Sequence, residues 1–175
     1  MSRTTDTSTS ATVGLEAFNE EPAGSLRPRL LTCLGVDRWA DEVLAGRPYA
    51  VRDAVFEVAD RAARRLSDVE LASALAGHPR IGERASAPEH DAELSRREQT
   101  GVDPQDAEVS AALAAGNAAY EERFDRVFLI RAAGRSAGEI LGELRRRLGN
   151  DDATERAETV DQLRQIALLR LEGIL

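Results

Sequence analysis

The sequence predicts an all-α fold, a single-domain irregular bundle of about eight helices. Apolar residues recur at positions i, i+3, i+4 and i+7 along most of the chain, which is the spacing of one helix face. Two capping boxes, Ser67 with Glu70 and Ser136 with Glu139, mark the starts of helices. The one apolar run that could form a buried strand, 127–130, has no evident partner strand in the sequence. With no sheet and no internal repeat, the helices are expected to pack on one another.

Composition limits the class of protein and of partner. The chain has 175 residues, of which 42% are hydrophobic and 31% charged, as expected for one soluble domain with a core. Its net charge of −8 disfavours nucleic acid and anionic membrane surfaces as partners. No apolar run approaches the roughly 18 residues of a membrane span, and the N-terminus lacks a signal-peptide core. Cys33 is the single cysteine, so no internal disulfide forms. These features predict a cytoplasmic protein.

The N-terminal part predicts a tail followed by two short helices. Residues 1–13 are rich in Ser and Thr and are expected to be disordered, and 14–175 form the folded domain. Pro28 is expected to be the first residue of a helix that ends at Gly35. Asp37 is expected to cap the next helix.

The first histidine follows directly after a predicted helix. Residues 51–62 keep strict helical order, and the Ser67 capping box then begins a helix that extends to Ala76. His78 follows this helix, and Pro79 cannot continue it. One interpretation is a helix-end histidine that binds the last carbonyl groups. The other is an acid/base group, since histidine has a pKa near neutrality. The residues alone leave both open.

A cluster of three polar side chains is expected on one face of a helix at 89–100. Ser95, Glu98 and Gln99 stand at i, i+3 and i+4, which places them side by side on that face. Taken alone, Glu98 is more often a solvated charge than a functional one. His90 has acidic neighbours and is expected at the surface.

The C-terminal half predicts two long helices and one irregular segment. Asp103-Pro104 is a helix start, and that helix is expected to end near Asp125. The run 127–130 is predicted to be an extended segment or half a turn of helix. A final helix is expected from about residue 152 to 174.

Arg170 is an anomaly, because it follows Ile166 by four residues and lies on the apolar face of the last helix. In one interpretation Arg170 is structural, either in an ion pair or with its side chain extended to the surface. In the other it anchors an anion or a carbonyl in a pocket.

Metal chemistry is not indicated, because the two histidines are twelve residues apart and Cys33 is distant and expected in the core. No phosphate loop or dinucleotide motif is present. A reaction without a metal or a cofactor is what remains.

An ordered set of motifs resembles one known family. The motifs are HPRIG at 78–82, SRREQTG at 95–101, LAAGNAAYEERF at 113–124, VFLIRAAGRS at 127–136, LRRRLGND at 144–151 and IALLRLEGIL at 166–175. Together they resemble the 2-oxo-4-hydroxy-4-carboxy-5-ureidoimidazoline (OHCU) decarboxylases, from about residue 15 to the end of the chain. The resemblance implies an all-helical, cofactor-independent homodimer that catalyses the last step from urate to (S)-allantoin.

The resemblance also implies roles for individual residues. His78 matches the catalytic histidine and Glu98 its partner carboxylate. Seven further positions match substrate-binding positions of the family: Pro79, Ser95, Gln99, Phe128, Leu129, Ile130 and Arg170. Pro79 matches the proline that fixes the histidine. Residues 128–130 match the segment whose backbone amides contact the ligand. The chain departs from many relatives at Asp125-Arg126 and at Arg131.

The chemistry fits these residue types. Loss of CO₂ from the hydroxyl-bearing ring carbon leaves electrons that the adjacent C=N can accept, so the substrate is its own electron sink. His78, paired with Glu98, would move the hydroxyl proton and protonate one face of the enol. Glu98 and Gln99 would hold the ureido group, and Arg170 would orient the ring.

Two other function classes are open at this point. An acidic helical interaction module would use His78 only as a helix cap and Arg170 only in a core ion pair. A hydrolase of a related ureide would keep the pocket and act on allantoin-like amides.

Overall fold

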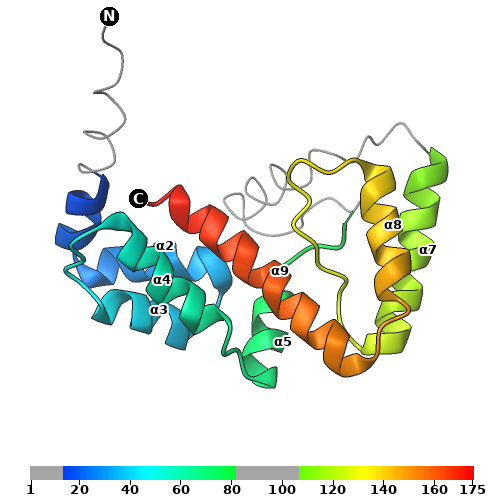
Figure 1. Ribbon diagram of the computed structural model, residues 1–175, viewed down its shortest axis with the longest axis horizontal. Coiled ribbons are helices and arrows are strands. Elements are labelled where there is room, and N and C mark those ends of the chain that lie inside the picture. The colour runs from blue at the N-terminus through cyan, green and yellow to red at the C-terminus, as the bar shows by residue number, and fades with distance from the viewer. Residues whose placement is uncertain (1–13, 82–106) are drawn as a thin grey trace, which may run out of the picture. The chain divides into compact units, whose positions relative to one another are not determined.

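The computed structural model describes residues 14–81 and 107–175, which are helical for most of their length and contain no strand (Figure 1). The all-α prediction is confirmed. Residues 14–20 are helical, and they are followed by α2 (Ala23–Leu34), α3 (Asp37–Ala45), α4 (Arg52–Ala63), α5 (Asp68–Ala76), α7 (Ala107–Phe124), α8 (Ala137–Arg147) and α9 (Asp152–Glu172).

The chain divides into two compact units, Met1–Leu66 with Arg164–Leu175, and Ser67–Leu163. We call them the first and the second unit. The boundary falls inside α9, so this helix contributes residues to both.

The first unit packs α2 on α3 and α3 on α4. Trp39 is fully buried, and its indole Nε1–H donates to the Ala59 carbonyl at 2.9 Å, which joins α3 to α4. Cys33 is also buried, as expected for a small core residue.

Two predicted helix starts in this unit are wrong. Pro28 lies inside α2, which begins at Ala23. Leu26 and Leu30 on either side of it are fully buried, and burial of this continuous apolar face offsets the missing backbone hydrogen bond. Asp37 does not cap α3 but is its first residue, after Val36. Its carboxylate accepts from Arg27 at 2.6 Å and lies in the first turn, where negative charge is favourable.

The second unit contains both predicted capping boxes. The Ser67 N–H donates to the Glu70 carboxylate at 2.8 Å, and the Glu70 N–H donates to the Ser67 hydroxyl at 3.3 Å. The Ser136 and Glu139 pair repeats this reciprocal pattern. The sequence therefore specifies where α5 and α8 begin.

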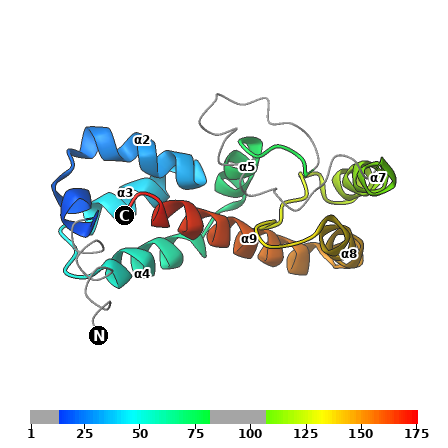
Figure 2. The same ribbon diagram turned by 90° about the horizontal axis from the view of Figure 1, so that it is seen from above.

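Helices α7 and α8 lie side by side in both views (Figures 1 and 2). They approach closely because Gly116 has no side chain: a Cβ there would stand 2.5 Å from Leu144 Cδ2. Helix α7 ends at Phe124, next to the predicted end. Between α7 and α8 the residues 127–130 are neither helix nor strand, as predicted.

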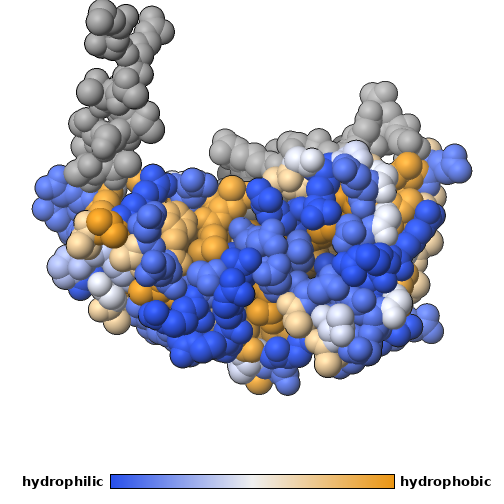
Figure 3. All heavy atoms as spheres, in the orientation of Figure 1, coloured by the Kyte–Doolittle hydropathy of each residue, from blue (hydrophilic) through white to orange (hydrophobic). Residues whose placement is uncertain are grey.

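Figure 3 shows one face of the protein, which is mainly hydrophilic, with hydrophobic residues in small separate groups. Among the described residues, no helix combines the length and apolarity that crossing a bilayer requires. The predicted tail at 1–13, the helix at 89–100 and the helix start at Asp103-Pro104 lie outside the described residues.

Candidate functional site

His78 stands at the C-terminal end of α5, in the second unit. Its backbone N–H donates to the Leu75 carbonyl at 3.0 Å, and its Nδ1 lies 2.9 Å from the Ala74 carbonyl oxygen. A carbonyl oxygen can only accept, so Nδ1 carries the hydrogen in this contact. In the neutral imidazole Nε2 is then the basic nitrogen, and this atom is shielded from solvent. His78 therefore binds a carbonyl group of the last helical turn through Nδ1, as the helix-end interpretation predicts. The same hydrogen bond selects the tautomer in which Nε2 can accept a proton.

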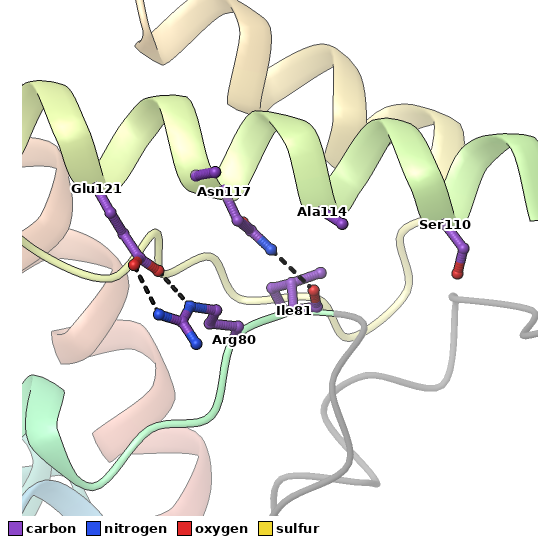
Figure 4. A pocket seen from close by; sticks show the side chains of 7 residues that line it. Arg80, Ile81, Ser110, Ala114, Asn117 and Glu121 are labelled. Atoms are coloured by element: carbon purple, nitrogen blue, oxygen red, sulfur yellow. Dashed lines mark hydrogen bonds and ion pairs between the residues drawn. The ribbon is translucent and has the colours of Figure 1, made fainter.

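The chain after Pro79 is tied to α7 at two points (Figure 4). Arg80 forms a two-pronged ion pair with Glu121, with Nη2 2.7 Å from Oε2. This guanidinium holds the pKa of Glu121 below its usual range. The Ile81 carbonyl accepts from Asn117 Nδ2 at 3.1 Å. These contacts limit the movement of the segment that carries His78 and Pro79.

A cavity of about 240 Å³ opens beside this segment (Figure 4). It is lined by Arg80, Ile81, Ser110, Ala114, Asn117, Ala118 and Glu121. Because Asn117 Nδ2 donates to a carbonyl, the orientation of the amide is determined, and its Oδ1 is the atom left to accept. Asn117 is 4% exposed, and its Oδ1 has no hydrogen-bond partner among the described residues.

The segment 128–130 is buried: Phe128 is 0% exposed, and Leu129 and Ile130 are each 4% exposed. The Leu129 carbonyl accepts from Arg147 Nη1 at 2.7 Å. The structure thus places the predicted amide segment in the same unit as His78, with its backbone held by a buried side chain.

Arg147 belongs to a buried ionic network that the sequence analysis missed. Its Nε and Nη2 donate to Glu155 Oε1, and Nη2 also donates to the Thr159 hydroxyl at 3.1 Å. The Tyr120 hydroxyl donates to the same Glu155 oxygen. Burial and this carboxylate together raise the pKa of Tyr120 to about 12, so the phenol stays protonated.

A signal for this network was present in the sequence. Arg147 follows Ile140 and Leu144 at i+7 and i+3, so it continues the apolar face of α8. Arg170 shows the same feature, a charged residue on the apolar face of a helix. A charged residue on an apolar helix face requires a buried partner.

Arg170 lies in the first unit, half-buried, and its Nη1 donates to the Thr32 carbonyl of α2 at 3.0 Å. This contact supports the structural interpretation of Arg170, and its role in substrate binding stays a prediction.

Ser95, Glu98 and Gln99 lie outside the described residues. In residues 14–81 and 107–175, no group of three or more His, Cys, Asp or Glu side chains could hold a metal ion.

Comparison with known proteins gives consistent matches. The family model for OHCU decarboxylase matches residues 19–172. The chain is 41% identical over 83 residues to the 2-oxo-4-hydroxy-4-carboxy-5-ureidoimidazoline decarboxylase of Amia calva, an alignment covering 46% of this chain and 47% of that protein. It is 26% identical over 143 residues to the uric acid degradation bifunctional protein TTL of Arabidopsis thaliana, covering 79% and 44%. The alignments thus span less than half the length of these curated relatives.

Two solved structures share the fold. A crystal structure of OHCU decarboxylase in the presence of (S)-allantoin matches with a TM-score of 0.67 and 21% identity, over 82% of this chain and 94% of that one. A crystal structure of (S)-allantoin synthase matches with a TM-score of 0.64 and 15% identity, over 92% and 54%.

Proposed function

Because the chain belongs to the OHCU decarboxylase family, we propose that it decarboxylates 2-oxo-4-hydroxy-4-carboxy-5-ureidoimidazoline to (S)-allantoin, in the last step of urate breakdown. The observation that carries the proposal is the family match over residues 19–172, which includes His78. The tautomer of His78 supports it, because Nδ1–H bound to Ala74 makes Nε2 the base.

The reaction breaks one carbon–carbon bond, takes up one proton from water at the ring nitrogen and moves the hydroxyl proton to carbon. The carboxylate leaves as CO₂, and its bonding electrons form a new ring double bond while the adjacent C=N nitrogen takes a proton. The resulting enol then loses its hydroxyl proton and gains a proton on carbon. Because the ring accepts the electrons, the reaction proceeds without a cofactor.

In this proposal His78 and Glu98 perform the proton transfers. His78 Nε2 takes the hydroxyl proton, and the pair delivers a proton to one face of the enol, which sets the (S) configuration. Glu98 and Gln99 hold the ureido group, and Ser95 contacts the ligand beside them. Pro79 restricts His78, and the amides of residues 128–130 contact the ligand. Arg170 orients the ring through a carbonyl or the developing oxyanion. A tight grip on the departing carboxylate would stabilise the ground state and would not accelerate the step.

The test is circular dichroism of the allantoin formed from freshly generated hydroxyisourate, made from urate with urate oxidase and hydroxyisourate hydrolase. We expect rapid appearance of optically active (S)-allantoin with the wild type, and a loss of about 10²-fold or more in rate with His78→Ala. Val69→Ala is the matched control, because Val69 lies on α5, the helix that precedes His78, and is 81% exposed.

The alternatives predict different results. An interaction module would leave the slow racemic spontaneous reaction unchanged, and His78→Ala and Glu98→Ala would affect no activity. A ureide hydrolase would consume (S)-allantoin itself, which incubation with allantoin alone would detect.

We also propose that the protein is a cytoplasmic homodimer that binds neither nucleic acid nor membranes. Light scattering on the eluting protein should then give about twice the chain mass of 19.0 kDa. A mass equal to one chain at working concentration would refute the dimer.

A further inference from the structure

The segment 127–131 is neither helix nor strand and has no strand beside it in the described part of the chain. Its backbone polar groups therefore need partners other than those of a sheet. Two helices of the second unit supply them. From α8, Arg147 Nη1 donates to the Leu129 carbonyl at 2.7 Å. From α9, Gln162 Oε1 accepts the Arg131 N–H at 2.8 Å. The backbone is therefore held on both sides of Ile130.

The Arg147 contact is rigid, because the guanidinium is held on every side. Arg147 is 1% exposed and Glu155 is fully buried, and the two are joined through Nε and Nη2. The other Glu155 oxygen accepts from Asn150 Nδ2 at 2.8 Å. The Phe128 ring lies under the guanidinium, with its centroid 4.9 Å from Cζ. A planar guanidinium can make these contacts together, which a lysine ammonium cannot.

This anchoring determines the direction of one amide. The Leu129 carbonyl and the Ile130 N–H belong to the same planar trans peptide unit and point to opposite sides. Since the carbonyl is held toward Arg147, the Ile130 N–H is aimed away from it. No hydrogen bond from this N–H is found among the residues that the structure describes. Ile130 is 4% exposed, and a buried amide without an acceptor is costly unless a ligand supplies one.

We propose that Arg147 and Gln162 are positioning residues, which hold the Leu129 carbonyl and the Arg131 amide so that the Ile130 N–H donates to a ring oxygen of the substrate. The proposal rests on the proposed function. Neither side chain touches the substrate. The ring oxygen gains negative charge as its proton leaves, so a well-aimed donor stabilises the transition state more than the bound substrate. If the Ile130 N–H is no longer held in this direction, kcat should therefore fall more than KM rises.

Two sets of variants test the proposal by kinetics. Arg147→Met with Glu155→Leu replaces the whole buried ion pair by apolar residues, a change that proteins often accept without loss of stability. Gln162→Leu removes the other anchor from a half-buried position, and Gln162→Glu restores an acceptor oxygen. We expect kcat to fall about tenfold or more in the double variant and in Gln162→Leu, with KM within about threefold. Gln162→Glu should recover most of the lost kcat.

The control for general destabilisation is Leu113→Ala, which removes a buried side chain of α7 from the same core cluster. When it is assayed well below its unfolding temperature, the kcat of Leu113→Ala should stay within about twofold of the wild-type value. A double variant or a Gln162→Leu variant that is folded and keeps the wild-type kcat overturns the proposal.

A second readout does not depend on turnover. In ¹⁵N-labelled wild-type protein, adding (S)-allantoin should shift the Ile130 amide resonance, because the product keeps the ring oxygens. In the double variant the Ile130 shift should be lost while other ligand-induced shifts persist. An active wild type whose Ile130 resonance does not respond refutes only the positioning role. A wild type that forms no (S)-allantoin refutes the proposed function itself.

Discussion

At the scale of single residues, Arg147, Glu155 and Tyr120 of the second unit form one buried hydrogen-bonded group. Burying the Arg147 charge is tolerated because Glu155 neutralises it and both Glu155 oxygens receive hydrogen bonds. The Tyr120 hydroxyl completes this set, and its ring packs against Phe128 with centroids 5.2 Å apart. Tyr120 thus connects α7 to α9 and supports the segment after α7 through its ring.

The raised pKa of Tyr120, about 12, predicts an alkaline loss of stability. The unfolded chain releases the phenolic proton near pH 10 while the folded protein keeps it, so the unfolding free energy falls as pH rises from about 10 to 12. We expect Tyr120 to account for roughly 1 to 2 kcal/mol of this fall, measured by urea unfolding. All 23 basic residues are arginine, so no lysine titrates in this range.

Tyr120→Phe should flatten that dependence and leave the part contributed by Tyr49, whose pKa burial also raises. Tyr49→Phe is the complementary control. An equal alkaline fall in Tyr120→Phe and in the wild type would contradict the assignment.

At the scale of elements, short helices depend on their caps. Helix α5 has only 9 residues and carries, in its last turn, the Ala74 carbonyl that binds His78. Helices this short are marginal by themselves, so the Ser67 capping box and packing of the apolar face must stabilise α5 together. Helix α8, with 11 residues, has the same device at Ser136.

Replacing either capping serine should lower the unfolding free energy. We expect Ser67→Ala and Ser136→Ala each to cost about 1 kcal/mol in urea unfolding, because a backbone N–H loses its acceptor. Ser67→Thr and Ser136→Thr keep a hydroxyl and should lose less. If alanine and threonine were equivalent at these positions, the hydroxyl would not be the stabilising group.

At the scale of the whole molecule, arginine–carboxylate pairs occur in both units. In the first unit Asp60 accepts from Arg64 at 2.7 Å and from Arg164 at 2.6 Å. In the second unit Glu158 accepts from Arg146. These guanidinium groups hold the pKa values of Asp60 and Glu158 below their usual ranges.

These lowered pKa values predict acid unfolding of the whole chain. The stabilisation is complete above the unfolded carboxyl pKa values, near 4, and is lost as the pH falls through the lower folded values. The urea midpoint should therefore fall between about pH 5 and pH 3, and less steeply in Glu158→Gln. Added salt should reduce the effect, because these groups are partly exposed. A midpoint that is constant down to about pH 3 would show that the pairs add no net stability.

Local interactions explain what the sequence alone determined. The capping boxes, the end of α5 before His78 and the end of α7 at Phe124 depend on contacts within about four residues, which a sequence displays directly. The lack of a strand partner for 127–130 and the apolar-face position of Arg170 were also readable. The ordered motifs were sufficient to indicate the family. Pro28 was misplaced because burial of Leu26 and Leu30 outweighed a local preference for the first turn.

Only the tertiary structure decided which distant groups meet. The partnership of Arg147 with Glu155 and of both with Tyr120 depends on how α7, α8 and α9 pack. The anchoring of Leu129 by Arg147 likewise joins positions 18 residues apart. Helical periodicity places a side chain on a face but does not specify what faces it, because that is set by packing of the whole core. The sequence thus indicated most of the helices and the family, and the packing determined which side chains hydrogen-bond to one another.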